Sequence, residues 1–249
     1  VERSRGLGDV YKRQTYAMLD DLKKNMSGEI VLGLTHEHGI DIFTSIFPQF
    51  NRRYPGISFT LIERIVAEQH QLLLDGNLDF GIVMLQESEK INLRYINLYR
   101  EQLILGIPQN HPMASFAAPP DAPLACLDLG LFKNDKFSLI FSASTMRRVL
   151  DPCFDEAGFR PSIVIETAMN HALVQMVASG FCCTIMSESR ARISPYYSRC
   201  AWFTLTSHPH WDVSIACRKD TQLSEAHKYF IRLAQKYGQK MESQFLQNR

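Results

Sequence analysis

The sequence predicts an α/β fold with mostly parallel sheets. Short apolar runs such as residues 30–32 and 80–84 have the length and composition of buried strands. Between such runs lie segments whose apolar residues recur at helical spacing, as in residues 42–50. Strands that alternate with helices along a chain are typical of βαβ units, which assemble into parallel sheets.

The first half of the chain continues this alternation. The turn signal Pro55-Gly56 is followed by alternating apolar residues, which predict a strand at 57–61. A helix is predicted around residues 72–74, and it ends at Gly76 because glycine is the usual residue just past a helix terminus. The buried strand at 80–84 comes next, so this half contains strands and helices in regular turn.

The second half repeats the same pattern of elements. A strand at 103–107 is stopped by Pro108, and a helix at 146–154 ends near Gly158. The remaining predicted elements are strands at 139–141, 163–165, 182–186, 202–205 and 213–217, with helices at 172–178 and 223–237. Periodicity therefore establishes a fold class, and a function has to be argued from other features.

Composition excludes several classes of function. Lys and Arg total 27 and Asp and Glu total 26, so the chain lacks the basic excess of a segment that grips DNA by itself. No apolar run reaches the roughly 18 residues of a membrane span, and no secretory signal is evident. The six cysteines show no metal-binding or disulfide spacing, which favours a reducing cytoplasm.

The amino-terminal residues differ from the rest of the chain. Residues 1–14, VERSRGLGDVYKRQ, have no helical or strand period and look like a sequencing or assembly artefact, so they are excluded from the fold. Residues 16–26 carry Met18, Leu19 and Leu22 on one side and predict the end of a helix.

Five short segments extend over nearly the whole chain in a specific order. They are SGEIVLGL at 27–34, RRYPGISFTL at 52–61, LLLDGNLDFGIV at 72–83, Asn110-His111-Pro112, and VASGFCCTIM at 177–186. Together they resemble the effector domain of LysR-type transcriptional regulators. The chain departs from that family at Phe181-Cys182 and Met186-Ser187, where a second Gly and a Pro are usual. It also has His36-Glu37-His38 where many members have Ser or Thr.

The resemblance implies two Rossmann-like lobes joined by two crossover strands, as in type-2 periplasmic binding proteins. Lobe I would comprise residues 27–107 and 208–249, and lobe II would comprise residues 108–207. The crossings near 107–108 and 207–208 would form a hinge that lets the lobes close over a ligand. Residues 15–26 would be the stump of a linker helix, and the winged helix-turn-helix of the family is expected upstream.

The resemblance places the effector between the lobes, near the carboxyl ends of strands. The candidate effector-binding residues are Thr35, His36, Glu37, Val66, Phe141, Ser142, Ala143, Ser144, Thr167 and Ala168. Ordinary turn residues and helix caps remain the alternative for each loop. A metal site at His36-Glu37-His38 is not expected, because the helical zinc signature places its histidines four residues apart.

The loop at 142–145 has two interpretations of equal weight. Its hydroxyl residues suit a helix N-cap, and the same helix start suits a carboxylate or phosphate. With Glu37 on the opposite wall, these residues predict an effector that is amino-acid-like or otherwise carries a carboxylate and a donor. Arg147 and Arg148 are interpreted as solvated charges on the helix face.

These observations predict a sensing module without enzymatic activity or cofactor. No G-x-S-x-G elbow, Rossmann glycine fingerprint or phosphate-binding loop is present. The resemblance implies a small-molecule effector, a cytoplasmic homodimer that becomes a tetramer in the full-length protein, and contact with DNA only through the absent amino-terminal domain. A type-2 periplasmic solute-binding protein is the alternative, because it shares the two-lobed fold.

Overall fold

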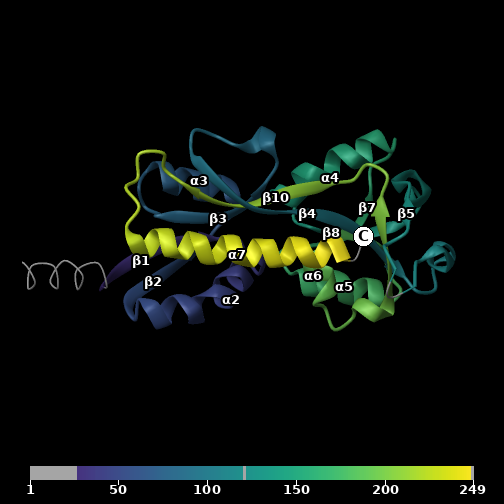
Figure 1. Cartoon of the computed structure of the whole chain (residues 1–249). Helices are drawn as coiled ribbons and strands as arrows, with labels where there is room; N and C mark the ends of the chain where they lie inside the picture. The colour runs from purple at the N-terminus through teal and green to yellow at the C-terminus, as the bar shows by residue number, and fades with distance from the viewer. Residues whose placement is uncertain (1–26, 120–121, 248–249) are drawn as a thin grey trace, which may run out of the picture.

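The computed structural model describes residues 27–119 and 122–247, and the amino-terminal segments 1–14 and 15–26 lie outside them. The strands are β1 (Ser27–Leu34), β2 (Gly56–Glu63), β3 (Phe80–Leu85), β4 (Arg94–Pro108), β5 (Cys126–Leu127), β6 (Lys136–Ile140), β7 (Ser162–Thr167), β8 (Thr184–Ser187), β9 (Cys200–Leu205) and β10 (His210–Cys217). The α-helices are α2 (His38–Arg53), α3 (Val66–Leu74), α4 (Thr145–Glu156), α5 (Asn170–Ala178), α6 (Glu188–Arg192) and α7 (Glu225–Gln247) (Figure 1).

The strands form a mixed sheet in the order β2-β1-β3-β10-β4-β9-β5, and β8 also pairs with β4. β1 is parallel to β2 and β3, and β5 is parallel to β9. In contrast, β4 is antiparallel to β8, β9 and β10, and β10 is antiparallel to β3. The prediction of mostly parallel sheets is therefore wrong at the centre of the molecule. No α-helix separates β3 from β4 or β9 from β10, so the βαβ rule does not govern these connections.

β4 is 15 residues long and belongs to both halves of the molecule. It pairs with β10 from Arg94 to Gln102, and with β8 and β9 from Leu103 to Pro108. We call the strands β1, β2, β3 and β10 with helices α2, α3 and α7 lobe I, and the strands β5 to β9 with helices α4, α5 and α6 lobe II. Figure 1 shows these two groups side by side, joined through β4 and β10.

The predicted lobe boundaries at 107–108 and 207–208 stay a prediction. β4 changes its pairing partner between Gln102 and Leu103, ahead of the first predicted crossing. The chain returns between the end of β9 at Leu205 and the start of β10 at His210, a span that includes the second predicted crossing.

Lobe II extends its sheet through backbone hydrogen bonds just before β8. The Ser138 amide donates to the carbonyl of Cys183 at 2.9 Å, and the Cys183 amide donates to the carbonyl of Lys136 at 2.8 Å. The parallel pair β6-β7 is thereby joined to the strands on β4. This places the carboxyl end of β6 and the start of α4 opposite lobe I.

Helix α7 lies along the molecule and packs on α2 and β4 (Figure 1). The rings of Phe50, Phe59 and Phe230 lie within 6.0 Å of one another in the core of lobe I. Gly238 of α7 approaches β4 so closely that a Cβ atom would lie 2.7 Å from the carbonyl carbon of Leu98. A glycine is required there because α7 and β4 are in backbone contact.

Three of the differences from the sequence prediction concern β4, α7 and α6. β4 begins at Arg94 rather than at 103, because its first half mixes exposed polar residues with apolar ones and forms a strand through its backbone pairing with β10. α7 continues to Gln247 rather than ending at 237. The five-residue helix α6 was not predicted, because it is too short to show a hydrophobic period.

Candidate functional site

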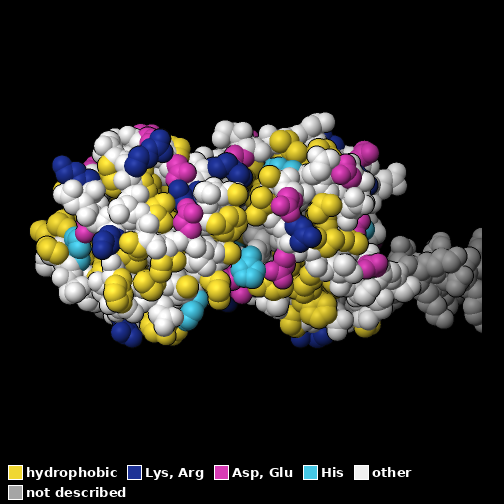
Figure 2. Space-filling model, turned by 180° about the vertical axis from the view of Figure 1, so that it is seen from behind, with side chains coloured by type: hydrophobic (Ala, Val, Ile, Leu, Met, Phe, Trp, Pro, Cys, Tyr) yellow, Lys and Arg dark blue, Asp and Glu magenta, His cyan; other side chains and the backbone are white. Residues whose placement is uncertain are grey.

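A cavity of about 360 Å³ lies between the two lobes. Lobe I contributes the loops that follow β1 and β2, and lobe II contributes the end of β6, the start of α4 and the loop after β7. Figure 2 shows the molecule hollowed between its two halves on the face opposite to that of Figure 1. The volume falls in the range of small-molecule pockets in proteins.

Six of the predicted residues line this cavity, namely Thr35, His36, Val66, Phe141, Ser144 and Ala168. The other four, Glu37, Ser142, Ala143 and Thr167, are not among its lining residues. The cavity thus lies between the loops that the sequence indicated, but some side chains of those loops face elsewhere.

The loop before α4 serves chiefly to cap that helix. The Ser144 hydroxyl accepts a hydrogen bond from the Arg147 amide at 3.2 Å, and Ser142 and Ala143 are exposed. Arg147 is buried against Glu166 and Asp151, so its interpretation as a solvated charge was wrong. Periodicity missed this because its acidic partners come from β7 and from the next turn of α4.

The loop after β7 contributes the predicted Ala168 to the cavity, and the start of α5 contributes Asn170 rather than Thr167. The Thr167 hydroxyl accepts a hydrogen bond from the Met169 amide at 3.2 Å, and Met169 is the N-cap of α5. Neither Thr167 nor Asn170 caps that helix, although both have the residue type of an N-cap. Asn170 is instead the first residue of α5, is buried, and lines the cavity.

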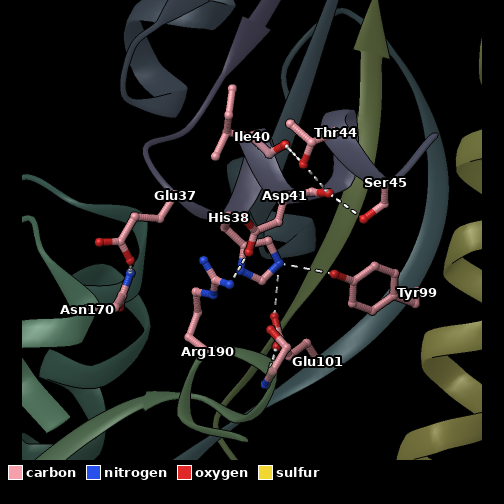
Figure 3. Close-up of polar contacts among 11 residues, drawn as sticks. Glu37, His38, Ile40, Asp41, Thr44, Ser45, Tyr99, Glu101, Asn170 and Arg190 are labelled. Carbon is pink, nitrogen blue, oxygen red and sulfur yellow. Dashed lines mark hydrogen bonds and ion pairs between the residues drawn. The ribbon is translucent and has the colours of Figure 1, made fainter. Parts of the chain in front are cut away.

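Glu37, the residue just before α2, links the two lobes. Its Oε2 atom accepts a hydrogen bond from Nδ2 of Asn170 at 2.9 Å (Figure 3). The Glu37 backbone has φ 58° and ψ −64°, and the His38 amide donates to the His36 carbonyl at 2.7 Å. This combination is a γ-turn of the strained kind with positive φ. The turn directs the carboxylate toward lobe II.

The polar lining also includes several residues that were not among the candidate effector-binding residues. They are His38, Glu63, Arg64, Thr145, Asn170, Ser187 and Arg190. His36 pairs with Glu63 through Nδ1 and Oε2 at 2.8 Å, and Arg64 pairs with Glu68 at 3.3 Å. Ser187 directly follows a predicted strand, so the rule that ligands bind at strand ends could have identified it.

The apolar lining comes from both lobes and from the crossover strand β10. Its members are Ile65, Val66, Met84, Ile140, Phe141, Met146, Ala168 and Trp211. An apolar surface with a few convergent polar groups is typical of sites that bind small metabolites.

Two buried polar atoms at this cavity have no hydrogen-bond partner among the described residues. They are Oγ of Ser187, which is fully buried at the end of β8, and Oδ1 of Asn170. Burying a hydroxyl or amide oxygen without a partner costs about 1–3 kcal/mol, so such atoms are rare in folded proteins. Both atoms are therefore suited to a ligand that supplies the missing partners.

A buried polar cluster lies beside the cavity, where the crossover strands meet. Glu101 accepts hydrogen bonds from the Ser189 amide and from Nε1 of Trp211, each at 2.9 Å. His38 Nε2 lies 3.1 Å from the Tyr99 hydroxyl and 3.4 Å from Glu101 Oε2 (Figure 3). Burial lowers the pKa of His38 below its usual 6.5, and Arg190 acts in the same direction while Glu101 opposes the change.

A second cavity of about 500 Å³ lies between α2, α6 and α7. His38 and Arg190 line both cavities, so they form a shared wall. We take the smaller cavity as the candidate site, because strand ends from both lobes line it and so do Ser187 and Asn170, the residues with the unpartnered buried atoms. Among residues 27–119 and 122–247, no group of three or more potential metal ligands comes together. No helix there is both long and apolar enough to cross a bilayer.

Curated relatives of this chain are transcriptional regulators. The HTH-type regulator YwbI of Bacillus subtilis is 26% identical over 221 residues, covering 88% of this chain and 70% of that protein. YybE of the same organism is 24% identical over 191 residues, covering 73% of this chain. The chain spans only 62% of the length of YybE. These relatives favour the regulator over the solute-binding protein.

Solved structures of regulator domains share the fold. The effector binding domain of QuiR in complex with shikimate has a TM-score of 0.68 at 20% identity, covering 86% of this chain and 98% of that domain. The CcmR regulatory domain of Synechocystis PCC6803 in complex with 2-PG has a TM-score of 0.72 at 18% identity, covering 86% of this chain and 99% of that domain. The family model of the LysR substrate binding domain matches residues 23–239, and this chain belongs to that family.

Proposed function

We propose that this chain is the effector-sensing module of a LysR-type transcriptional regulator, and that its effector is a small polar metabolite bound in the cavity between the lobes. The observation that carries the proposal is a pair of buried oxygen atoms, Ser187 Oγ and Asn170 Oδ1, that have no protein partners among the described residues and belong to two residues lining this cavity. Shikimate and 2-PG, the ligands named for QuiR and CcmR, support a small molecule as the effector.

The hydrogen-bonding groups of the cavity indicate which chemical groups the ligand carries. Ser187 offers a hydroxyl donor, and Oδ1 of Asn170 accepts a hydrogen bond from a ligand hydroxyl or ammonium. Thr35, His36, Phe141 and Ala168 form the surrounding walls. In this proposal Glu37 does not contact the ligand. It accepts a hydrogen bond from the Asn170 amide and so positions Asn170. The ligand is thus amino-acid-like or a hydroxy acid, with a donor at one end.

Sensing would follow from contacts with both lobes. A ligand shifts a conformational equilibrium only by its differential affinity for the two arrangements, and a ligand bridging Asn170 and lobe I favours the closed one. In our proposal closure biases a cytoplasmic homodimer, in which α2 packs antiparallel to a lobe II helix of the partner, and a tetramer in a longer protein. DNA would be read by a winged helix-turn-helix outside this chain, and the ligand is bound without turnover.

The experiment that tests the proposal is native mass spectrometry of the purified protein, followed by calorimetric titration of the metabolite that copurifies. Ser187→Ala and Asn170→Ala should each weaken its binding by about twofold to tenfold, the usual effect of one neutral hydrogen bond. Ser179→Ala is the matched control, because its hydroxyl donates to the Gln175 carbonyl on the exposed side of α5. Equal affinity in all four proteins would contradict the proposal.

A further inference from the structure

We propose that Arg190 is the anion receptor of the inter-lobe cavity, and that Asp41 competes with the ligand for its guanidinium group. This inference rests on the proposed function and adds two statements to it. The effector carries a carboxylate or phosphate group, and its binding releases a contact between α6 of lobe II and α2 of lobe I.

Arg190 occupies a position that both cavities share. Its side chain is only 9% exposed and lines the inter-lobe cavity as well as the cavity between α2, α6 and α7. The guanidinium pairs with the carboxylate of Asp41, which comes from the first turn of α2 (Figure 3). One cation can therefore be reached by an anion from two sides, from Asp41 on one and from a ligand on the other.

The two partners of this ion pair differ in their access to water. The side chain of Asp41 is 44% exposed, so water can solvate its carboxylate once the pair separates. The Arg190 guanidinium is buried, and a buried charge without a counter-charge is strongly unfavourable. Arg190 therefore needs an anion at all times, whereas Asp41 can be exchanged for another. Arginine also presents five N–H donors in a planar fork that suits carboxylate and phosphate oxygens.

Glu101, another acidic group near this wall, is already engaged. Glu101 accepts hydrogen bonds from the Ser189 amide and the Trp211 indole, and it lies 3.4 Å from His38. It is held in place by these donors and is not available to replace Asp41. Ser187, three residues before Arg190, lines the same cavity, and its buried hydroxyl has no partner among the described residues. Arg190 and Ser187 together offer donors to one oxyanion.

The experiment uses sodium acetate and inorganic phosphate as probes, titrated at constant ionic strength and followed by amide chemical shifts of the whole chain. The wild type should bind at least one probe saturably. Asp41→Asn should tighten binding about tenfold, because the competing charge is gone and the buried guanidinium lacks a counter-charge. Arg190→Gln should weaken binding about tenfold or more, as expected for a charge-assisted hydrogen bond. The two probes distinguish a carboxylate from a phosphate preference.

The matched control is Glu89→Gln, which removes another ion pair between the lobes, Arg148 with Glu89 at 2.5 Å, away from Arg190. If Asp41 only holds the two lobes together, Asp41→Asn should weaken probe binding, as Glu89→Gln would. That result, or the absence of saturable binding, would overturn the proposal. Arg190→Lys retains the cation and should bind more tightly than Arg190→Gln, which guards against loss through misfolding.

The same variants separate this inference from the proposed function. If a copurifying metabolite binds in the cavity with equal affinity to the wild type and Arg190→Gln, the sensing function stands and the role of Arg190 is refuted. If acetate or phosphate binds at Arg190 but no metabolite depends on Ser187 or Asn170, the anion site stands and the proposed effector site fails.

Discussion

The carboxylate of Glu101 in β4 accepts a hydrogen bond from the indole of Trp211 in β10, its direct cross-strand neighbour. The Glu101 side chain is completely buried, and its other oxygen accepts from the Ser189 amide in α6. One carboxylate therefore joins both crossover strands to lobe II at the place where β4 changes its pairing partner. Glu101 also lies 3.4 Å from His38, so these contacts reach one residue of the wall between the two cavities.

We expect Trp211→Phe to lower the free energy of unfolding by about 1–3 kcal/mol, because a buried carboxylate loses one of its donors. Urea denaturation followed by circular dichroism would measure the change. Trp202→Phe is the control, since the Trp202 indole donates to the neutral carbonyl of Tyr197 at 2.9 Å. The prediction fails if Trp202→Phe proves the more damaging of the two.

Stability should decrease as the pH falls below about 6.5 because of His38. Burial lowers the pKa of this imidazole in the folded protein, so the unfolded chain binds more protons between the folded pKa and the usual 6.5. The contribution of His38 is thus complete above 6.5 and is lost as the pH drops through this window. Burial also lowers the pKa of His70 and His227, which adds to the same trend.

His38→Gln should therefore show a shallower dependence of the unfolding free energy on pH between about 5 and 7. Denaturation midpoints at several pH values would give the slope. Ser179→Ala serves as the control, because it removes an exposed side chain without a titratable group and should keep the slope of the wild type. Identical slopes for wild type and His38→Gln would show that the buried imidazole does not contribute.

Gly238→Ala should destabilise the protein, although alanine ordinarily stabilises a helix by about 1 kcal/mol relative to glycine. A Cβ atom at this position would meet the backbone of Leu98 in β4, which cannot move without disturbing the sheet. The thermal midpoint would detect the loss. The neighbouring exposed residue offers the comparison, because Gln239→Ala should leave the midpoint nearly unchanged. A stabilised Gly238→Ala would mean that α7 and β4 lie farther apart.

Glu37 offers a test of stored backbone strain. Both Glu37→Ala and Glu37→Gly remove the hydrogen bond to Asn170, but only glycine adopts φ 58° with ψ −64° without steric cost. We expect the glycine variant to be more stable than the alanine variant by about 1–3 kcal/mol. Chemical denaturation of the pair would measure the difference. Alanine equal to or better than glycine would argue against the γ-turn.

Sequence patterns predict those elements whose stability comes from their own residues. The buried strand β3 and the amphipathic helix α2 were identified because their apolar residues repeat locally. The first half of β4 was missed because Arg94, Asn97 and Arg100 look like loop residues until β10 pairs with them. The antiparallel direction of the crossover strands likewise depends on contacts between distant segments.

In the candidate site, too, the sequence predicted features that depend on local residues and missed features that depend on contacts between distant segments. The loops after β1, β6 and β7, predicted from the rule that ligands gather at the carboxyl ends of strands, do line the cavity, and their contact with an effector stays a prediction. Which side chain of a loop faces the cavity depends on local backbone geometry, as the γ-turn at Glu37 shows. Arg190 could not be predicted, because its proximity to Asp41 requires α6 and α2 to meet across the lobes.

The position of β10 between β3 and β4 has a consequence for synthesis on the ribosome. Every strand assigned to lobe II leaves the ribosome before β10, so lobe II can fold while lobe I still lacks its central strand and α7. Until then β3 and β4 present open edges, which are prone to pair with other chains. A chain truncated before His210 and released from the ribosome would thus carry one finished lobe and one exposed half-sheet, and chaperones should engage the half-sheet.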